Sequence, residues 1–439
     1  MKVLKFGGTS VGSALNMTKV AEIVKSEGAK VTVLSAMSGT TDSLVKIVAL
    51  CEGGKDNISK VDELLEVLKE KYSTCIAELL KDGESALDKM TKAFDIIKQQ
   101  ALDFKEYTSE RVIISQGELL TSAIFTMYMN QIGLKAVLLN APDFMTTDSE
   151  GIVNTERLAS ELSSLESEGV YYVTQGFIST NHLGQTDNLG RGGSDYSAAL
   201  IGAAINAEQV QIWTDIDGMH NNDPRVVENT YPIRSMTFDE AAELAYFGAK
   251  ILHPATIQPC KDKGIAVLLK NTMEPSAAGT TISNVDDNQE QLHAVAAKDK
   301  ISVIRICSTR MLMAYGFLRR VFEVFEKHKT PIDMIVTSEV SVSVTVDCEA
   351  HLDEIMSDLA DFGRVQIEKG NNTIVCIVGK LTQEECGLAV KVLDSINTIP
   401  VKMISYGASN RSMAILVDTK YKNQTLQKLN DGLFVNKLK

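Results

Sequence analysis

The first part of the chain alternates short apolar runs with segments of helical length. Residues 3–6 have the pattern of a buried strand, glycines follow, and residues 13–26 have helical spacing. Similar strand-like runs, separated by segments long enough for helices, occur at residues 30–34, 135–139, 170–174, 210–214 and 265–269. This alternation predicts an α/β fold with a mostly parallel sheet.

Residues 55–100 interrupt this alternation, because Lys, Glu, Leu and Ile recur there at helical spacing. We therefore expect a helical insertion. Residues 283–293 are polar and acidic and lack periodicity, which is typical of a domain boundary.

Beyond this boundary the pattern changes to two successive α+β modules. Strands are predicted at 303–307, 332–337, 340–346 and 365–368, with helices at 316–327 and 351–360, which is the βαββαβ order of a ferredoxin-like fold. The order begins again with strands at 373–378, 401–405 and 413–417 and helices at 384–396 and 422–430. Gly316 recurs as Gly387 and Val346 as Val417, both 71 residues later, which supports a repeat. The expected domains are 1–290, 298–370 and 371–439.

Composition and charge narrow the possible functions. The 439 residues predict two to three domains, and the formal charge of −13 makes wrapping of nucleic acid an unfavourable function. An anionic substrate would have to be met by locally clustered Lys and Arg. The seven cysteines are scattered without a C-x-x-C pair, and no signal peptide or membrane-spanning run is evident. We expect a cytoplasmic protein with reduced thiols that binds neither nucleic acid nor membrane.

The first glycine-rich loop, residues 7–13, follows a strand and opens a helix, where free N–H groups can bind phosphate. It is not a Walker motif, because Ser13 and Ala14 follow the last glycine and Lys5 lies before the loop. A plain tight turn is the alternative interpretation of the two adjacent glycines.

The second loop, residues 190–195 with the sequence GRGGSD, also enters a helix. Arg191 is suited to a carboxylate and Asp195 to an ammonium group. Asp195 stands where a dinucleotide-binding fingerprint needs glycine, and Ser194 or Asp195 can equally be a helix cap.

The remaining motifs are individually weak. The turn TDIDG at 214–218, DPR at 223–225 and GAK at 248–250 each have ordinary structural interpretations. The DFG at 361–363 is interpreted as a helix C-cap, because the other kinase motifs are missing from the sequence. The six histidines lack metal-ligand spacing, so we expect no protein metal site.

Taken in order, KFGGTSV, GRGGSD, WTDIDG with DPR, and GAKILHP resemble the aspartate kinases of the amino-acid-kinase fold. This resemblance implies a three-layer α/β fold with a mostly parallel sheet. The resemblance covers essentially the whole chain, because the two C-terminal modules are similar to that family's tandem ACT domains. MLMAYGFLRRVF and DMIVTSEVSVSVT are similar to the lysine-sensitive branch. We expect a monofunctional enzyme, since no segment long enough for a fused homoserine dehydrogenase is present.

The resemblance implies transfer of the γ-phosphoryl group of ATP, carried with Mg²⁺, to the side-chain carboxylate of L-aspartate. The product is 4-phospho-L-aspartate, at the first step toward lysine, threonine and methionine. The carboxylate is already ionised at pH 7, so catalysis should consist of positioning and charge neutralisation.

The same resemblance implies the site residues. The catalytic residues are Lys5, Asp195 and Lys250. The aspartate-binding residues are Thr41, Glu118, Arg191, Ser194 and Asp195. The ATP-binding residues are Lys5, Gly7, Gly8, Ser10, Thr214, Asp215, His220, Arg225, Lys250 and Ile251. On sequence pattern alone, Glu118 is typical of a surface carboxylate at a helix start.

L-Lysine is the implied effector, and the implied assembly is a homodimer or a dimer of dimers through the ACT domains. The implied lysine site comprises Met311, Gly316, Phe317, Leu318, Asp333, Thr337, Ser338, Glu339 and Val340. The sequence departs from the family pattern at His220, Asp42 and Ala314, where tyrosine, asparagine and serine are common.

Two alternative functions stay open. One is a kinase for another carboxylate such as glutamate, although GRGGSD and SQGE favour aspartate. The other is a catalytically silent amino-acid sensor, against which the presence of Lys5, Arg191 and Lys250 argues.

Overall fold

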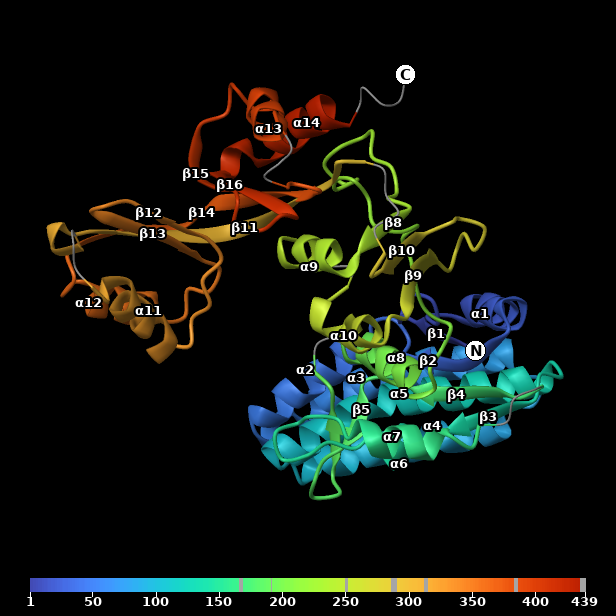
Figure 1. Ribbon diagram of the computed structural model, residues 1–439. Coiled ribbons are helices and arrows are strands. Elements are labelled where there is room, and N and C mark those ends of the chain that lie inside the picture. The colour runs from blue at the N-terminus through green and yellow to red at the C-terminus, as the bar shows by residue number, and fades with distance from the viewer. Residues whose placement is uncertain are drawn as a thin grey trace. The chain divides into compact units, whose positions relative to one another are not determined.

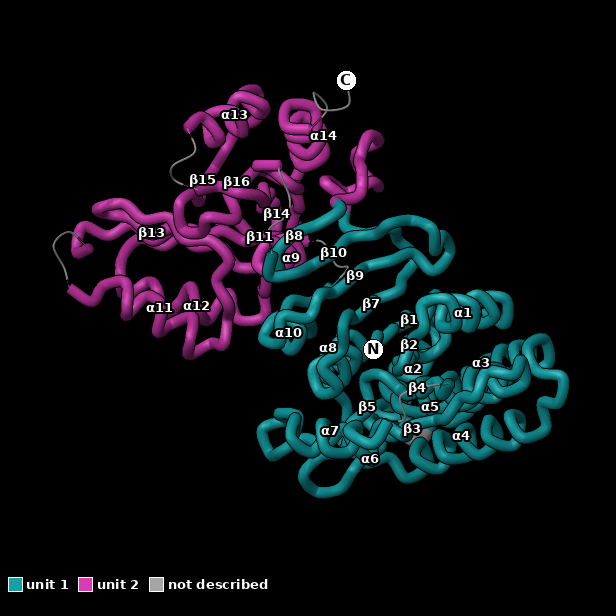
Figure 2. Tube along the Cα trace, turned by 45° about the vertical axis from the view of Figure 1, so that its right-hand side comes forward, with its two compact units in different colours: residues 1–219, 234–238, 252–286 teal, residues 220–233, 239–251, 287–439 magenta. Residues whose placement is uncertain are grey.

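The computed structural model describes residues 1–165, 169–190, 192–248, 252–285, 290–311, 315–382 and 386–434. The chain divides into two compact units, which Figure 2 shows in different colours. The first comprises residues 1–219, 234–238 and 252–286, and the second comprises residues 220–233, 239–251 and 287–439. Residues 220–233 and 239–251, which lie within the expected 1–290 domain, belong to the second unit, and so do the expected modules 298–370 and 371–439.

Within the described residues, the first unit is built around an eight-stranded sheet in the order β3-β4-β2-β1-β7-β9-β10-β8 (Figure 1). Its strands are β1 (Lys2–Phe6), β2 (Ala29–Leu34), β3 (Ala136–Leu139), β4 (Tyr171–Gln175), β7 (Gln209–Thr214), β8 (Ser235–Thr237), β9 (Ala266–Asn271) and β10 (Thr280–Ser283). Neighbouring strands of this sheet are parallel, apart from β9 with β10. The six expected strands occur within two residues of their expected positions, which confirms the mostly parallel α/β fold.

Helices pack on both faces of this sheet. They are α1 (Ala14–Glu27), α2 (Thr40–Glu52), α3 (Ile58–Leu79), α4 (Glu84–Leu102), α5 (Glu106–Gln131), α6 (Ala141–Phe144), α7 (Thr155–Leu162), α8 (Gly193–Ala204) and α10 (Pro254–Lys263). Leu4 and Phe6 belong to the core that β1 shares with α1, α3 and α5. Because side chains alternate along a strand, Lys5 points to the opposite face, where α8 packs on β1. A short hairpin, β5 (Ile178–Thr180) and β6 (Thr186–Asn188), leads toward α8.

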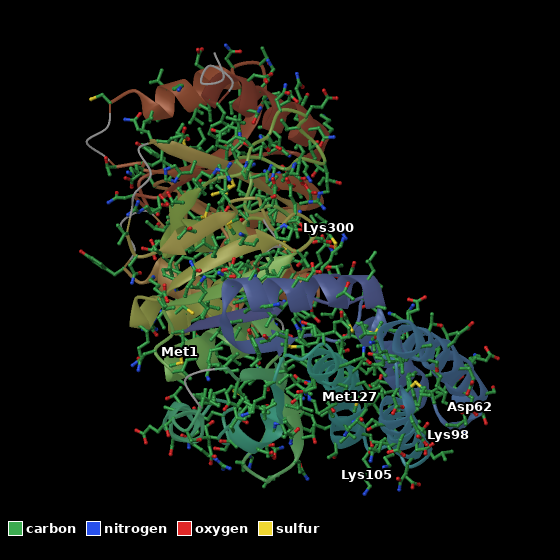
Figure 3. All side chains as sticks on the ribbon, turned by 90° about the vertical axis from the view of Figure 1, so that its right-hand side faces the viewer. Met1, Asp62, Lys98, Lys105, Met127 and Lys300 are labelled. Carbon is green, nitrogen blue, oxygen red and sulfur yellow. The ribbon has the colours of Figure 1, made fainter. Side chains whose placement is uncertain are left out.

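The expected helical insertion is present as a 3₁₀ turn (Lys55–Asn57) followed by α3 and α4. The two helices pack through apolar positions, and Tyr72 of α3 meets Phe94 of α4 edge to face with ring centroids 6.2 Å apart. Asp62 and Lys98, labelled in Figure 3, add an ion pair of 2.9 Å between the same helices. Because both of these side chains are about half exposed, the packing contributes more to the stability of the insertion than the ion pair does.

The long helix α5 forms the centre of this helical layer. By length and composition alone it could cross a membrane, but 78% of its most apolar 18-residue stretch is buried inside the protein. Its buried residues include polar ones such as Glu118 and Thr121. α5 is therefore a core helix of the first unit.

The second unit contains a six-stranded antiparallel sheet among its described residues, in the order β12-β13-β11-β14-β16-β15. Its strands are β11 (Leu292–Cys307), β12 (Ile335–Thr337), β13 (Ser341–Val346), β14 (Arg364–Gly379), β15 (Val401–Ser405) and β16 (Ser412–Asp418). Its helices are most of α9 (Phe238–Tyr246), α11 (Phe317–Lys327), α12 (Leu352–Leu359), α13 (Leu388–Ser395) and α14 (Lys422–Leu433), with 3₁₀ turns at Thr309–Met311 and Thr419–Tyr421. Two ferredoxin-like modules are thus present, as expected.

The two modules share their central strands. β11 and β14 are 16 residues long, and each runs through both modules. Residues 303–307 of β11 pair with the start of β14 in the first module, whereas residues 292–298 pair with its end in the second. The second module lacks a final strand in sequence order, and residues 292–298 supply it. The sequence pattern missed this exchange because the pairing joins residues about 80 positions apart.

The shared strand predicts a selective effect of core mutations. Val295 lies in the core of the second module and Val344 in that of the first, both buried. We expect Val295→Ala to cost roughly 1–3 kcal/mol and to speed amide hydrogen exchange in β16 and the second half of β14. Val344→Ala should instead speed exchange in β12 and β13. Equal loss of protection in both modules for Val295→Ala would contradict this assignment of the strand.

Candidate active site

The expected site residues of the first unit gather at one edge of the sheet. β1, β2, β4, β7 and β9 are parallel, so their carboxyl ends meet at the same edge. In the sheet, β2 and β4 lie on one side of β1, whereas β7 and β9 lie on the other side. In open α/β sheets, ligands bind beyond the carboxyl ends of the strands at such a switch point.

The central charged contact is an ion pair between Lys5 of β1 and Asp195 of α8. Lys5 Nζ lies 2.8 Å from Asp195 Oδ1, and the two side chains are only 12% and 13% exposed. Asp195 stands in the first turn of α8, where the helix end also favours a negative charge. The sequence indicated both residues separately, but their mutual contact is visible only in the structure.

The adjacent glycines allow the loop after β1 to approach its neighbours closely. A Cβ on Gly8 would lie 2.8 Å from the carbonyl oxygen of Ala36, and the Gly8 carbonyl accepts a 3.0 Å hydrogen bond from the Ser38 N–H. A Cβ on Gly7 would lie 3.6 Å from Lys5 Nζ, in ordinary contact. Gly8 is therefore needed for close backbone packing against the loop after β2, in addition to forming a turn.

Ser10 is buried, and its hydroxyl is engaged within the protein. It lies 2.7 Å from the Thr272 hydroxyl and 3.4 Å from the carbonyl oxygen of Trp213. These contacts tie the first glycine loop to the ends of β7 and β9. The loop then enters α1, whose N-cap is Ser13.

Glu118 is a buried carboxyl in the middle of α5, not the surface carboxylate that its sequence pattern suggested. Its side chain is 3% exposed, and Oε1 accepts a 3.2 Å hydrogen bond from the Ala36 N–H. Its other oxygen, Oε2, has no hydrogen-bond partner among the described residues. Burial raises the pKa of Glu118 to about 7. A cationic ligand would satisfy the unpaired oxygen and lower this pKa.

The second glycine loop places Ser194 beside the loop after β2. The Ser35 hydroxyl donates a 3.0 Å hydrogen bond to Ser194 Oγ, and a Cβ on Gly176 would lie 2.6 Å from the Ser194 Cβ. Gly192, with a φ of 70°, is the N-cap of α8. Thr41 is exposed in the first turn of α2. Arg191 lies outside the described residues.

The expected nucleotide-binding residues are distributed over both units. Thr214 and Asp215 follow β7 in the first unit, and the Thr214 hydroxyl lies 3.0 Å from Asp215 Oδ1. His220 and Arg225 belong to the second unit, where His220 Nδ1 lies 3.0 Å from the Thr230 hydroxyl. Lys250 and Ile251 lie outside the described residues.

Arg225 is 84% exposed, and its guanidinium group forms two hydrogen bonds with Asp223, of 2.9 and 2.8 Å. This contact lowers the pKa of Asp223 and raises that of Arg225. The arginine fork is therefore occupied by a carboxylate of its own turn.

Sequence reasoning missed several polar residues at this edge. Ser35, Gly176 and Thr272 each directly follow the last residue of a strand that ends there. Their position after a predicted buried strand was the signal that could have identified them. In the described part of the chain, His, Cys, Asp and Glu side chains do not form a group of three or more that could hold a metal ion.

The expected effector residues belong to the first module of the second unit. They are Met311, Gly316, Phe317, Leu318, Asp333, Thr337, Ser338, Glu339 and Val340. Phe317 is buried against Phe362, whereas the turn 337–340 is exposed. Asp333 Oδ1 accepts hydrogen bonds of 2.7 Å from both Lys298 Nζ and the Tyr246 hydroxyl. Ala314 lies outside the described residues.

Two family profiles match the chain: the amino acid kinase family over residues 1–271 and an ACT domain over residues 375–433. The chain is also 33% identical, over 453 residues, to the lysine-sensitive aspartokinase 3 of Escherichia coli K12, spanning 98% of this chain and 99% of the relative. The chain belongs to the aspartokinase family. The resemblance inferred from the glycine loops is thereby confirmed.

Solved structures of an aspartokinase share this fold. The E. coli aspartokinase III complex with aspartate and ADP matches with a TM-score of 0.85 at 32% identity, covering 99% of this chain and 100% of the other. The complex of the same enzyme with lysine and aspartate matches with a TM-score of 0.81 at 32% identity, covering 99% of both chains. The amino-acid-kinase fold followed by ACT modules is therefore confirmed for this aspartokinase.

The buried carboxyl of Glu118 predicts a distinct pH dependence of stability. Its pKa is raised from 4.5 to about 7, so between these values the folded chain holds a proton that the unfolded chain loses. The stabilisation is complete below pH 4.5 and is lost as the pH rises through about 7. We expect Glu118→Gln to remove this decline in the free energy of unfolding between about pH 5 and pH 8.

Denaturant unfolding of the ligand-free enzyme at several pH values measures this effect. Glu106→Gln, an exposed glutamate of the same helix, is the control and should retain the wild-type decline. Identical pH profiles for wild type and Glu118→Gln would contradict the assigned burial of the carboxyl group.

Proposed function

We propose that this aspartokinase transfers the γ-phosphoryl group of ATP to the side-chain carboxylate of L-aspartate, yielding 4-phospho-L-aspartate and ADP. The reaction would be the first step toward lysine, threonine and methionine. The observation that carries the proposal is the group of charges at the sheet edge, where Lys5 pairs with Asp195 and Glu118 holds an unsatisfied carboxyl oxygen. The aspartate and ADP in the solved complex of the E. coli relative support the same pair of ligands.

The chemical difficulty is the approach of two anions. The aspartate carboxylate has an ordinary pKa of about 3.9, so it is ionised near pH 7 and needs no general base. One of its oxygens bonds to the γ-phosphorus while the bond from phosphorus to the bridging oxygen breaks, and ADP leaves with that electron pair. In our proposal Lys5 contacts the transferring group and offsets its charge. The 2.8 Å contact with Asp195 holds the Lys5 ammonium group in place before the substrates bind.

The proposed aspartate site combines opposite charges for the two ends of the amino acid. Asp195 and Glu118 would receive the ammonium group, which explains a buried carboxyl oxygen without a partner. Arg191 would bind the α-carboxylate with its planar fork. Ser194 and Thr41 would complete the site with hydroxyl groups.

The proposed ATP site begins at the first glycine loop. Gly7 and Gly8 let the nucleotide phosphates approach the backbone, Ser10 fixes the loop, and the start of α1 offers N–H groups. Lys250 would hold the phosphates, and Thr214, Asp215, His220 and Ile251 would border the nucleotide. Arg225 could reach a phosphate only by leaving Asp223. Mg²⁺ would arrive bound to the ATP phosphates.

We further infer that L-lysine inhibits the enzyme through the ACT modules and that two chains associate through these modules. Lysine appears in the name of the E. coli relative and in one of its solved complexes. For association, β12 is an edge strand of the sheet with Ile335 43% and Val336 36% exposed, and Val340 of the next turn is 44% exposed. Such an apolar edge favours pairing with a second copy, as a homodimer or a dimer of dimers.

All seven cysteines are free, in keeping with a reducing cytoplasm.

The first test traps the acyl phosphate. With ATP, Mg²⁺ and L-aspartate, we expect hydroxylamine to yield aspartyl hydroxamate, and Lys5→Met to lower the rate at least a hundredfold. Lys2→Met, three residues earlier on the same strand and paired with Glu27, is the control and should keep wild-type activity. Hydroxamate with L-glutamate in place of L-aspartate would point to another carboxylate kinase. Without any hydroxamate, the chain would be a silent sensor.

The second test addresses the effector. We expect L-lysine at millimolar concentration to suppress hydroxamate formation. Glu339 is exposed, and Glu339→Gln should raise the lysine concentration for half inhibition about tenfold, because it removes a charge partner of the ligand's ammonium group. Glu326→Gln, an exposed glutamate of α11, should leave it unchanged. L-Threonine is titrated separately. Full activity at saturating L-lysine would refute the lysine assignment while leaving the kinase proposal intact.

A further inference from the structure

The segment 35–40, which joins β2 to α2, is fixed to α5 by two consecutive backbone groups. The Ala36 N–H donates to Glu118 Oε1 at 3.2 Å, and the Met37 N–H donates to Thr121 Oγ1 at 3.1 Å. Glu118 and Thr121 are three residues apart, so they lie on the same face of the helix. A slip of the segment by one residue would break both hydrogen bonds.

Thr121 is built to accept this contact. Its side chain is fully buried, and its hydroxyl donates its own proton to the Gly117 carbonyl at 2.8 Å. The hydroxyl orientation is therefore set by α5, which leaves a lone pair directed at the Met37 N–H. Valine has the same shape as threonine but can neither donate nor accept a hydrogen bond.

The helical insertion holds the same segment from a second direction. Lys71 Nζ of α3 donates to the carbonyl oxygen of Ser38, and the hydroxyl of the neighbouring Tyr72 lies 3.3 Å from the Thr40 hydroxyl. Two successive residues of α3 thus contact the end of the segment. This gives the insertion a role that its sequence pattern did not indicate.

The segment is also closely packed. Ala36, Met37 and Thr40 are buried, and a Cβ on Gly117 of α5 would lie 2.7 Å from the Ala36 Cβ. A cavity of about 390 Å³ borders Met37 and is lined on its other sides by the start of α1 and by α3, including Lys71. The hydrogen bonds to Thr121 and Lys71 add direction to this packing, because van der Waals contacts alone do not fix the orientation of backbone N–H and C=O groups.

We infer that Thr121 and Lys71 are positioning residues for the phosphoryl-transfer reaction. They hold the segment that leads to Thr41 and carries Ser35, and through Ser35 they set its contact with Ser194. The inference rests on the proposed function, because only there are Thr41, Ser194 and Glu118 aspartate contacts. The expected signature is a selective loss of aspartate affinity, because the segment leads to proposed aspartate contacts. Thr121 and Lys71 are themselves not among the proposed substrate contacts.

Steady-state kinetics of full-length variants test the inference. We expect Thr121→Val to raise the KM for aspartate about tenfold while the KM for ATP stays within about twofold, because the Met37 N–H loses its acceptor. Thr121→Ser restores the hydroxyl and should restore the KM. Lys71→Met should act in the same direction as Thr121→Val.

Two matched controls separate positioning from general damage. Thr126→Val removes a buried hydroxyl five residues further along α5 that donates to its own helix. Lys69→Met removes a partly exposed lysine of α3 that pairs with Glu66. Both should leave the KM for aspartate at the wild-type value. If Thr126→Val matches Thr121→Val, or if Thr121→Ser fails to restore the KM, Thr121 is only structural and the inference is wrong.

Hydrogen exchange of the ligand-free enzyme gives a readout that does not depend on activity. We expect faster exchange in residues 36–40 for Thr121→Val and unchanged exchange there for Thr126→Val. Faster exchange with an unchanged KM for aspartate would overturn the positioning role. Thr41→Val tests the proposed aspartate site itself. If Thr41→Val leaves the KM for aspartate unchanged while Thr121→Val raises it, the assignment of Thr41 in the proposed function is wrong. The positioning role of Thr121 would then still stand.

Discussion

The ion pair of Lys5 and Asp195 is the contact on which the site depends. Lys5 is only 12% exposed, and its partner Asp195 is supplied from a helix on the face of the sheet opposite to the apolar core of β1. β1 is hydrogen-bonded to β2 on one side and β7 on the other, so the backbone of Lys5 has little freedom. The chain as a whole carries a charge of −13, which repels an anionic nucleotide. A rigidly held ammonium group at the switch point of the sheet supplies positive charge locally and offsets that repulsion.

The loops at this edge also fix one another. Gly8 packs on the carbonyl of Ala36, and Gly176 packs on Ser194, with no room for a side chain at either contact. Ser35 then bridges from the loop after β2 to the start of α8. Because each loop is held by backbone or hydroxyl contacts from the next, the charged groups do not depend on one flexible segment for their geometry. The loop after β2 borders the cavity, and there hydrogen bonds with α3 and α5 add to its packing.

Hydrophobic patterns in the sequence predicted the features that depend on residues close together along the chain. Six of the eight strands of the first sheet, the helical insertion and the repeated α+β order follow from hydrophobic periodicity, and all are present. The contact of Lys5 with Asp195 and the burial of Glu118 were not predictable in the same way, because each depends on which helix packs on which face. The same holds for residues 220–233 and 239–251, which belong to the second unit although they lie within the kinase part of the sequence. The family resemblance supplied the candidate residues, whereas the structure supplied their partners.

The exchange of strands between the ACT modules follows from the free-energy cost of leaving the edge of a strand unpaired. Without residues 292–298, the second half of β14 would present unpaired N–H and C=O groups beside the buried Val375 and Ile377. The same sixteen-residue strand, β11, then continues into the first module, so one continuous strand contributes a different half to each module. The ACT profile begins only at residue 375, after the first half of β14, and so omits both halves of β11. A segment cut at those limits would lack its closing strand, and on physical grounds the smallest independent regulatory unit must begin before residue 292.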